Sequence, residues 1–353
     1  MTSFLEAFDL SLEEMFSGRD AARELLGSIR GQFFHDTLAA RAPGVAAASR
    51  SALTNQAFNL FSETGLSTYF GLHRDVPSAL SSLEDLWSAL LSEPVVFHDL
   101  AEWCFAFAIL DASSRFQMDL CPSPNNENGL STALVTYLAN ACDAWAKTMQ
   151  APLSRRGGHL ALHHLDLSIL GGEQSTGGDF GLILEFDDAT ATPGSAPRRS
   201  KGAVPIVLQA KRYTGDLADV SQHHAVRGYQ YSYLAGNPCA SAYVFYDNGA
   251  IRNDIPLPPI VKPVDKVSGP GRTSVQSDSL DLPAYLLTAI ADEKFAPCAD
   301  DPDQALKMIF AKADPGQLST LAVISADQGA AWRYAAALEK LADFRLGRET
   351  ERH

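Results

Sequence analysis

The spacing of apolar residues changes along this chain, and that change limits the folds available to it. Up to about residue 120, apolar side chains recur every three or four positions, which is the spacing of one face of an α-helix. From Leu160 onward, short apolar runs bounded by Gly, Pro or Asp replace this pattern and are typical of buried β-strands. The runs are LALHHLDLSIL, GLILEF, VPIVLQAKRY and SAYVFYDN. The sequence therefore predicts a helical N-terminal region followed by an α/β unit.

The order of the predicted elements gives a first topology. A helix at 130–149 precedes the strands, and a helix at 217–235 lies between the third and the fourth strand. A strand, a helix and a strand in this order favour at least one parallel pair. The Pro-, Gly- and Ser-rich segment 188–202 is interpreted as a mobile loop that closes a hairpin of the second and third strands. After Asn253 we expect a Pro-rich excursion extended along the surface. Further helices are predicted at 282–291, at 303–311 and in the terminal stretch SADQGAAWRYAAALEKLADFRLG.

A length of 353 residues corresponds to about two domains, or to one elaborated domain with a helical extension. We divide the chain into a helical N-terminal region (1–120), an α/β core (121–255) and a C-terminal part (256–353) with the Pro-rich segment and a helical cap. The N-terminal residues lack the basic stretch of a secretory signal. The longest apolar stretch, 95–110, contains charged residues and is too short to span a bilayer, so it is interpreted as a buried helix.

Charge and cysteine content exclude several classes of protein. There are 28 Lys and Arg residues against 42 Asp and Glu residues, a formal net charge of −14. This is the wrong sign for a protein that coats nucleic acid through bulk electrostatics, so any contact with a polyanion requires a local basic patch. The five cysteines are widely spaced, with no CxxC pair, which indicates neither a zinc knuckle nor a secreted disulfide framework. A reducing cytoplasm is the expected location.

An ordered set of polar residues lies in and around the predicted core. Glu127 stands just before a helix, Asp179 opens the strand of GGDFGLILEF, Gln209 and Lys211 lie in VLQAKRY, and Gln230 lies in YQYSYLAG. A hairpin of the two strands would bring Asp179 beside Gln209 and Lys211. Gln209 and Lys211 are two residues apart and therefore point to the same face of their strand. An acid, an amide oxygen and an ammonium group are thus expected to converge.

That convergence suits the hydrolysis of a phosphodiester. A hard divalent cation held by carboxylate and carbonyl oxygens neutralises the phosphate and lowers the pKa of bound water. Asp179 supplies a charge, and the Gln209 side-chain oxygen is a ligand that does not titrate, beside the carbonyl of Ala210. Lys211 would orient the attacking water and offset charge on the phosphate oxygens.

These residues resemble the PD-(D/E)xK nuclease superfamily, including its restriction-endonuclease-like, Mrr-like and RecB-like branches. The resemblance covers about residues 125–248. It implies an α/β fold with a restriction-endonuclease-like mixed central sheet flanked by helices, to which the helical N-terminal region and the helical C-terminal cap are additions. It also implies Mg²⁺ or Mn²⁺ as cofactor and nucleic acid as substrate, with DNA favoured over RNA. The matching positions are Glu127, the GGD of Gly177, Gly178 and Asp179, the QxK of Gln209 and Lys211, and Gln230.

Two positions depart from the family pattern. Gln209 stands where the second acid is usual, as in the QxK of Mrr-like enzymes, and removes one negative charge from the metal site. Gly178 stands where a proline often precedes the first acid. The setting expected by analogy is bacterial defence against phage or a toxin acting on a rival's DNA. A homodimer or a regulatory protein partner is left open, and no membrane partner is expected.

Ordinary structural interpretations stand beside the functional ones. Asp179 after two glycines can be a turn residue, Lys211 can reach solvent along its stem, and Glu127 near a helix N-terminus is favoured by the helix dipole. Gln230 can be a surface polar group. Glu185, on the same strand face as Asp179, is interpreted as a weaker spare acid that is too distant for the same metal.

Two alternative functions remain open at this stage. The neutral Gln209 and the acidic net charge would suit a catalytically silent binding or assembly module that kept the fold. His159, His163 and His164 would suit a zinc hydrolase if their segment were helical, but its alternation predicts a strand, which separates His159 from His164. Basic residues that would flank the site are Arg155, Arg156, Arg198, Arg199, Lys201, Lys211 and Arg212, and tyrosines able to stack on bases or to pack in the core are Tyr213, Tyr229, Tyr231 and Tyr233.

Overall fold

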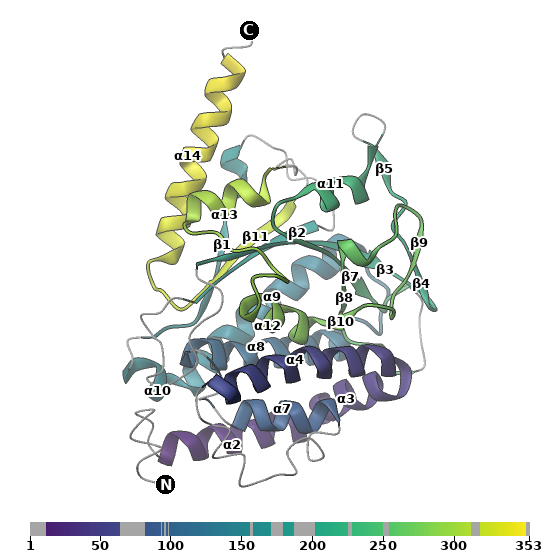
Figure 1. Ribbon diagram of the computed structural model, residues 1–353, viewed down its shortest axis with the longest axis vertical. Coiled ribbons are helices and arrows are strands. Elements are labelled where there is room, and N and C mark those ends of the chain that lie inside the picture. The colour runs from purple at the N-terminus through teal and green to yellow at the C-terminus, as the bar shows by residue number, and fades with distance from the viewer. Residues whose placement is uncertain are drawn as a thin grey trace.

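A mixed sheet of seven strands lies at the centre of the protein (Figure 1). The computed structural model describes residues 12–63, 82–92, 94, 97, 99–155, 158–170, 179–186, 202–224, 228–249, 254–311 and 318–350. The strand order across the sheet is β1-β11-β2-β3-β7-β8-β10. These strands are β1 (Ala161–Leu165), β11 (Leu318–Ser325), β2 (Asp179–Glu185), β3 (Val204–Arg212), β7 (Ala240–Tyr246), β8 (Ile260–Pro263) and β10 (Leu280–Asp281).

Two parallel pairs and four antiparallel pairs make up this sheet. β11 runs parallel to β2, and β3 runs parallel to β7. The remaining neighbours, including the hairpin partners β2 and β3, are antiparallel. Two small ribbons lie beside the sheet. They pair β4 (Leu217–Asp219) with β9 (Arg272–Ser274), and β5 (His223–His224) with β6 (Gly228–Tyr229).

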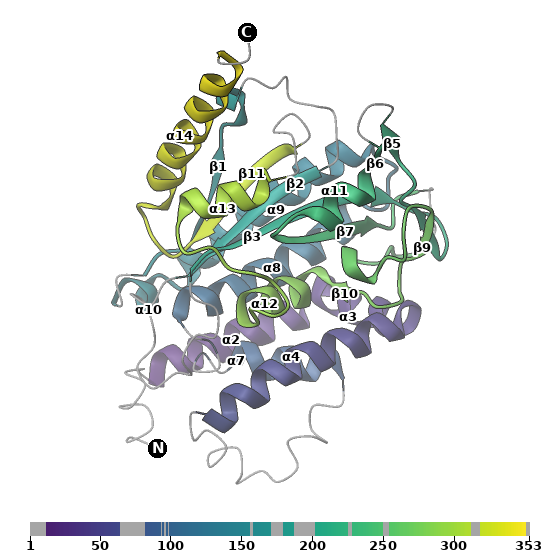
Figure 2. The ribbon, with the colours of Figure 1, turned by 45° about the horizontal axis from the view of Figure 1, so that its top comes forward.

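Helices cover both faces of the sheet (Figures 1 and 2). The apolar α8 and α9 lie on one face, and α11 and α13 lie on the other. Beyond α8, the helices α2, α3, α4 and α7 form a further layer. The bounds are α2 (Leu12–Gly27), α3 (Ile29–Arg41), α4 (Pro43–Glu63), α7 (Leu83–Ser92), α8 (Leu100–Asp119), α9 (Glu127–Thr148), α10 (Gln150–Arg155), α11 (Gln230–Gly236), α12 (Leu282–Ala291), α13 (Pro302–Ile309) and α14 (Ala330–Thr350), with 3₁₀ turns η2 (Leu167–Leu170) and η4 (Val264–Lys266).

Side-chain caps define where several helices begin. The Ser82 hydroxyl accepts a hydrogen bond from the Asp85 N–H (3.0 Å), and the Asp85 carboxylate accepts one from the Ser82 N–H (3.2 Å). This reciprocal arrangement satisfies two backbone donors at the start of α7. Asp99 caps α8 through Glu102 N–H, and Asn126 caps α9 through Gly129 N–H (both 2.6 Å). The Asn126 cap places Glu127 in the first turn of α9.

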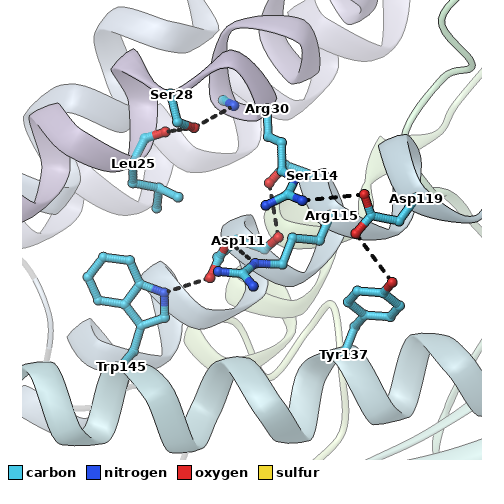
Figure 3. Close-up of polar contacts among 10 residues, drawn as sticks. Leu25, Ser28, Arg30, Asp111, Ser114, Arg115, Asp119, Tyr137 and Trp145 are labelled. Carbon is cyan, nitrogen blue, oxygen red and sulfur yellow. Dashed lines mark hydrogen bonds and ion pairs between the residues drawn. The ribbon is translucent and has the colours of Figure 1, made fainter.

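Polar contacts join α3, α8 and α9 where these helices pack (Figure 3). Asp111 of α8 accepts hydrogen bonds from Arg115 Nε (2.7 Å) and from Trp145 Nε1 of α9 (3.2 Å). Asp119, at the end of α8, contacts Arg30 of α3 (3.4 Å) and accepts from the Tyr137 hydroxyl of α9 (3.3 Å). Two carboxylates of α8 thus make polar contacts with both neighbouring helices.

Most of the predicted elements are confirmed. The four apolar runs contain β1, β2, β3 and β7, and the second and third strands form the predicted antiparallel hairpin. The parallel pairing of β3 with β7 is also confirmed. The helix predicted at 130–149 begins three residues earlier, at Glu127, after its Asn126 cap. In the stretch 95–110, which was interpreted as a buried helix, α8 begins at Leu100 after its Asp99 cap. The loop 188–202 and residues 1–11 lie outside the described residues, apart from Gly202.

The helix predicted at 217–235 is wrong. Among the described residues of this segment, 217–224 and 228–235, the helical part is α11, and the residues before it include the short strands β4, β5 and β6. Asp219 accepts hydrogen bonds from the Ser221 N–H (2.8 Å) and the Ser221 hydroxyl, a local turn that competes with a helix. Val220 N–H donates instead to Gly271 O (2.7 Å), so this segment is tied to β9. Local apolar spacing could not anticipate that pairing.

The Pro-rich segment is not a surface excursion. It supplies β8 to the central sheet, where Ile260 and Val261 are fully buried. A second difference is β11, which the sequence analysis missed and which lies between β1 and β2. The central sheet therefore continues past residue 255, into the part that we expected to be a helical cap. None of the helices in the described part of the chain combines the length and apolar character needed to cross a membrane.

A buried imidazole lies in the helical region. His35 of α3 is buried, and its ring packs edge-on against Phe34 with a centroid separation of 5.1 Å. Burial lowers the pKa of His35 from 6.5 to about 4, because the charged form loses its hydration. The unfolded chain therefore binds a proton as pH falls below about 6.5, whereas the folded chain does so only near pH 4. The stability conferred by this difference is fully present above pH 6.5 and is lost as pH falls toward 4.

We expect His35→Leu to flatten the acid limb of the stability profile. The pKa difference corresponds to about 3 kcal/mol in the free energy of unfolding between pH 6.5 and 4, at about 1.4 kcal/mol per pKa unit. Urea unfolding at several pH values measures this slope. Phe34→Leu, on the same helix, is the control, since it weakens the core but keeps the imidazole. Equal slopes for His35→Leu and the unsubstituted protein would contradict the prediction.

Candidate active site

Strand β3 carries two polar side chains where it passes beyond its neighbour. The pairing of β2 with β3 begins at Asp179 opposite Gln209, so Ala210, Lys211 and Arg212 extend past the start of β2. Gln209 and Lys211 are only 2% and 6% exposed. Their side chains point to the same face, as expected for residues two apart in a strand. The pairing of β2 with β3 therefore brings the backbone of Asp179 close to Gln209 and Lys211, as the sequence predicted. The position of Asp179 is known only from this backbone pairing.

Lys211 is held by two partners. Its Nζ donates a hydrogen bond to Gln222 Oε1 (2.8 Å) and lies 3.7 Å from Glu127 Oε2. A buried ammonium group needs such partners, because burial removes its hydration. The ion pair with Glu127 brings together two residues that are 84 positions apart and that the sequence analysis assigned to one site.

Glu127 is anchored to the end of β3. Its Oε1 accepts a hydrogen bond from the Arg212 N–H (3.1 Å), while Oε2 faces Lys211. The position in the first turn of α9 also favours a carboxylate, because the helix dipole is positive there. The dipole interpretation and the site interpretation of Glu127 are therefore both compatible with its geometry.

The loop before α9 is fastened by Asn248, which follows β7 and is fully buried. Asn248 Nδ2 lies 2.6, 2.9 and 3.2 Å from the carbonyl oxygens of Ser123, Cys121 and Leu120. Its Oδ1 accepts from the Asn125 N–H (2.7 Å). The Arg212 guanidinium adds a hydrogen bond to Asn125 O. One amide thus holds the turn that carries Glu127, a role that no local pattern in the sequence indicated.

The side-chain oxygen of Gln209 is buried and accepts no hydrogen bond within the described residues. An unpaired buried carbonyl oxygen is costly, so its position calls for a partner. Amide and carboxylate oxygens are ligands for hard divalent cations. Three oxygen donors here fit such a cation chemically: Gln209 Oε1, the Ala210 carbonyl of the same strand, and the Glu127 carboxylate that faces Lys211. The backbone of Asp179 lies opposite Gln209 in the β2–β3 register.

Gln230 is connected to Lys211 through one residue, Gln222. It is the first residue of α11, and its N–H donates to the backbone oxygen of Gln222 (3.0 Å), whose side chain holds Lys211. The backbone of Gln230 is therefore linked to the residue whose side chain holds Lys211, and a role for the Gln230 side chain stays a prediction. Gln222 itself was missed, because a glutamine between two very short strands carries no distinguishing pattern.

A polar row continues across the sheet from Gln209. Tyr243 of β7 pairs with Gln209, and Lys262 of β8 pairs with Tyr243. Lys262 is buried, and its Nζ donates to Ser274 O (3.1 Å). Burial lowers the pKa of Lys262. Because its ammonium group binds a carbonyl of β9, Lys262 stabilises the β4–β9 ribbon and is not part of the cluster around Lys211.

Two further carboxylates, Asp219 and Glu185, have structural roles. Asp219 has a lowered pKa, chiefly because the Ser221 hydroxyl and N–H hydrogen-bond to it, with further contributions from the charges of Lys211 and Arg272. Glu185, the proposed spare acid, lies at the other end of β2 and is bound through both oxygens by Arg333 (3.2 Å each). This places Glu185 in an ion pair away from Lys211.

The histidine segment forms strand β1, as its alternation predicted. His163 and His164 are adjacent in that strand and so point to opposite faces. Burial, and secondarily the charge of His159, lowers the pKa of His163. In the residues that the structure describes, no group of three or more His, Cys, Asp or Glu is placed to hold a metal ion. Most of the basic residues expected to flank the site have side chains outside the described part: Arg155, Arg156, Arg198, Arg199 and Lys201.

Comparisons of the chain with protein-family models, with curated proteins and with solved structures give no match.

We expect Asn248→Ala to loosen the turn that carries Glu127. The substitution leaves several buried backbone groups without partners, and each unpaired group costs about 1–3 kcal/mol. Hydrogen exchange should become faster in peptides that cover residues 120–130, more than in peptides from β3 and β7. Asn140→Ala, at an exposed position of α9, is the matched control and should leave exchange unchanged. Unchanged protection of residues 120–130 in Asn248→Ala would refute the role assigned to this amide.

Proposed function

We propose that this protein is a metal-dependent nuclease that hydrolyses phosphodiester bonds, with DNA favoured over RNA as substrate. The observation that carries the proposal is the buried, unpartnered Gln209 oxygen, beside a lysine that is held by Glu127 and Gln222. The resemblance to PD-(D/E)xK nucleases supplies the family expectation for the same residues. The mixed sheet flanked by helices is compatible with a restriction-endonuclease-like core.

Each residue of the cluster has a distinct role in this proposal. Gln209 Oε1, Ala210 O and the carboxylates of Asp179 and Glu127 would hold Mg²⁺ or Mn²⁺. When bound, the cation supplies a water of lowered pKa and offsets charge on the phosphate oxygens. Lys211 is oriented by Gln222 and faces Glu127, and its ammonium group has three N–H donors. A donor not used in these two contacts would hydrogen-bond the attacking water, and the positive charge would stabilise negative charge on the phosphate. Gln230 would support Gln222 through its backbone.

The biological setting proposed is defence against foreign DNA or action as an antibacterial toxin. This part of the proposal rests on analogy with stand-alone nucleases. The acidic net charge would limit non-specific coating of DNA, so substrate contact must be local to the cluster.

The test is cleavage of plasmid, linear duplex DNA, single-stranded DNA and RNA by the purified full chain at low salt. We expect cleavage with Mg²⁺ or Mn²⁺, none with EDTA, and a loss of about 10²-fold or more in Lys211→Ala and Asp179→Ala, a magnitude typical of a lost electrostatic contact to the reacting group. Lys147→Ala removes an exposed lysine of α9 that pairs with Asp143, and it should cleave normally.

Three outcomes would contradict this proposal. Metal-dependent cleavage that survives in both Asp179→Ala and Lys211→Ala would show that another site is responsible. No cleavage of any substrate by the unsubstituted protein would favour the silent binding module, and tightly bound zinc in purified protein would favour the histidine alternative. Circular dichroism of each variant checks that a loss of activity does not reflect unfolding.

Gln209→Glu tests whether this position is a ligand. The added carboxylate increases the negative charge of the donor set, so the Mg²⁺ concentration at half-maximal cleavage should fall by about tenfold, equivalent to about 1.4 kcal/mol. A titration of Mg²⁺ at fixed substrate measures this change. Gln117→Glu, at another buried glutamine in α8, controls for a buried carboxylate elsewhere. An unchanged half-maximal concentration in Gln209→Glu would argue against ligation by this side chain.

A further inference from the structure

Two aromatic side chains, Tyr229 and His223, meet on the β5–β6 ribbon. The ribbon lies beside α11 (Figure 2). Tyr229 is 44% exposed, and its ring meets that of His223 edge-on, with centroids 4.7 Å apart. The other tyrosines of this region are more enclosed: Tyr213 is buried, and the Tyr231 hydroxyl donates to Val267 O (3.1 Å). Of the four tyrosines considered for base stacking, Tyr229 therefore presents the most accessible ring.

Short links join this aromatic pair to Lys211. Gln222 directly precedes His223, and Gln230 directly follows Tyr229. The Gln230 N–H donates to Gln222 O, closing the base of the ribbon, and the Gln222 side chain holds Lys211 Nζ at 2.8 Å. The ribbon and the lysine thus share one residue. A ligand bound to the Tyr229 ring would therefore lie at a defined position relative to Lys211.

A positive side chain lies near the same ribbon. Arg272 of β9 is exposed and pairs in register with Asp219 of β4, three residues before Gln222. The charges of both Lys211 and Arg272 act on Asp219, so the two cations flank one short segment. Arg272 is therefore an exposed cation close to the ribbon, on a chain whose net charge is −14.

We propose that Tyr229, whose ring is braced edge-on by His223, stacks on an unpaired nucleobase, so that the site takes single-stranded nucleic acid, with Arg272 facing a neighbouring phosphate. This inference rests on the proposed nuclease function and specifies its substrate class. Every base offers a π face to an aromatic ring, and such stacking tightens binding by about 5- to 150-fold per base. In a duplex the base faces are covered by their stacked neighbours. Only an unpaired base or a frayed end can offer its face to Tyr229.

The test measures binding without cleavage. Oligonucleotides with 2-aminopurine at one position, as DNA and as RNA, are titrated with the full chain in EDTA and in Ca²⁺, alone and annealed to a complement. We expect quenching and tighter binding for the single strand. Tyr229→Ala should raise the Kd for the single strand by about tenfold, within the stacking range. Tyr229→Phe, which keeps the ring, should bind as the unsubstituted protein does.

Trp332→Ala is the matched control for losing an exposed aromatic ring. Trp332 is 77% exposed on α14, at the opposite edge of the sheet from the β5–β6 ribbon (Figure 1). This variant should keep the original Kd. Arg272→Ala should weaken binding of single-stranded DNA and RNA and reduce its dependence on salt. Comparing the Kd values of the DNA and RNA oligonucleotides shows which of the two nucleic acids the site prefers.

Two results would overturn the stacking proposal while the nuclease proposal stands. They are a Tyr229→Ala variant that binds the single strand as tightly as the unsubstituted protein, and a duplex that binds as tightly as its single strand. In either case, metal-dependent cleavage that requires Lys211 would still show a nuclease. If the unsubstituted protein neither binds nor cleaves any nucleic acid, both proposals are wrong.

Discussion

The burial of two polar side chains in β3 is the constraint on which the rest of the candidate site depends. β3 lies in the middle of the sheet with helices on both faces, yet it carries Gln209 and Lys211 near its end. A buried ammonium group without partners would be strongly destabilising. Glu127 and Gln222 provide those partners from two different parts of the chain. The folded structure thus retains a charge in its interior by bringing α9 and the segment before β5 to the end of one strand.

Residues just after β7 connect this strand end to the remaining layers. Asn248 holds the turn before α9, and therefore the position of Glu127. Its neighbour Asp247 is buried, and it binds Arg41 at the end of α3 (3.0 Å) and the Leu257 N–H before β8 (2.9 Å). Arg41 also reaches Asp254 (3.2 Å). The helical N-terminal region is therefore joined to the sheet close to the cluster, through charged groups as well as through apolar packing.

The candidate site was only partly predictable. Glu127, Asp179, Gln209 and Lys211 carry a recognisable order and spacing, and the β2–β3 register together with the ion pair to Glu127 agrees with their proximity. Gln222 and Asn248 have no such spacing, because their roles depend on contacts with residues far away in the sequence. The segment 217–235 shows the same limit. Its apolar spacing favours a helix, but hydrogen bonds from Val220 to Gly271 and from Ser221 to Asp219 favour short strands and a turn.

The sequence by itself determined the local elements whose signals are short-range: the capped helices, the four apolar strands and the parallel pair that follows from their order. Only the tertiary structure decided that β11, from the C-terminal part, lies between β1 and β2, and that the Pro-rich segment supplies a buried strand. Strand insertion depends on backbone pairing with distant partners, which apolar spacing within a segment does not encode. For the same reason, the sequence identified Lys211 and Glu127 as site residues, whereas only the fold showed that these two side chains pair and that Gln222 accepts a hydrogen bond from Lys211.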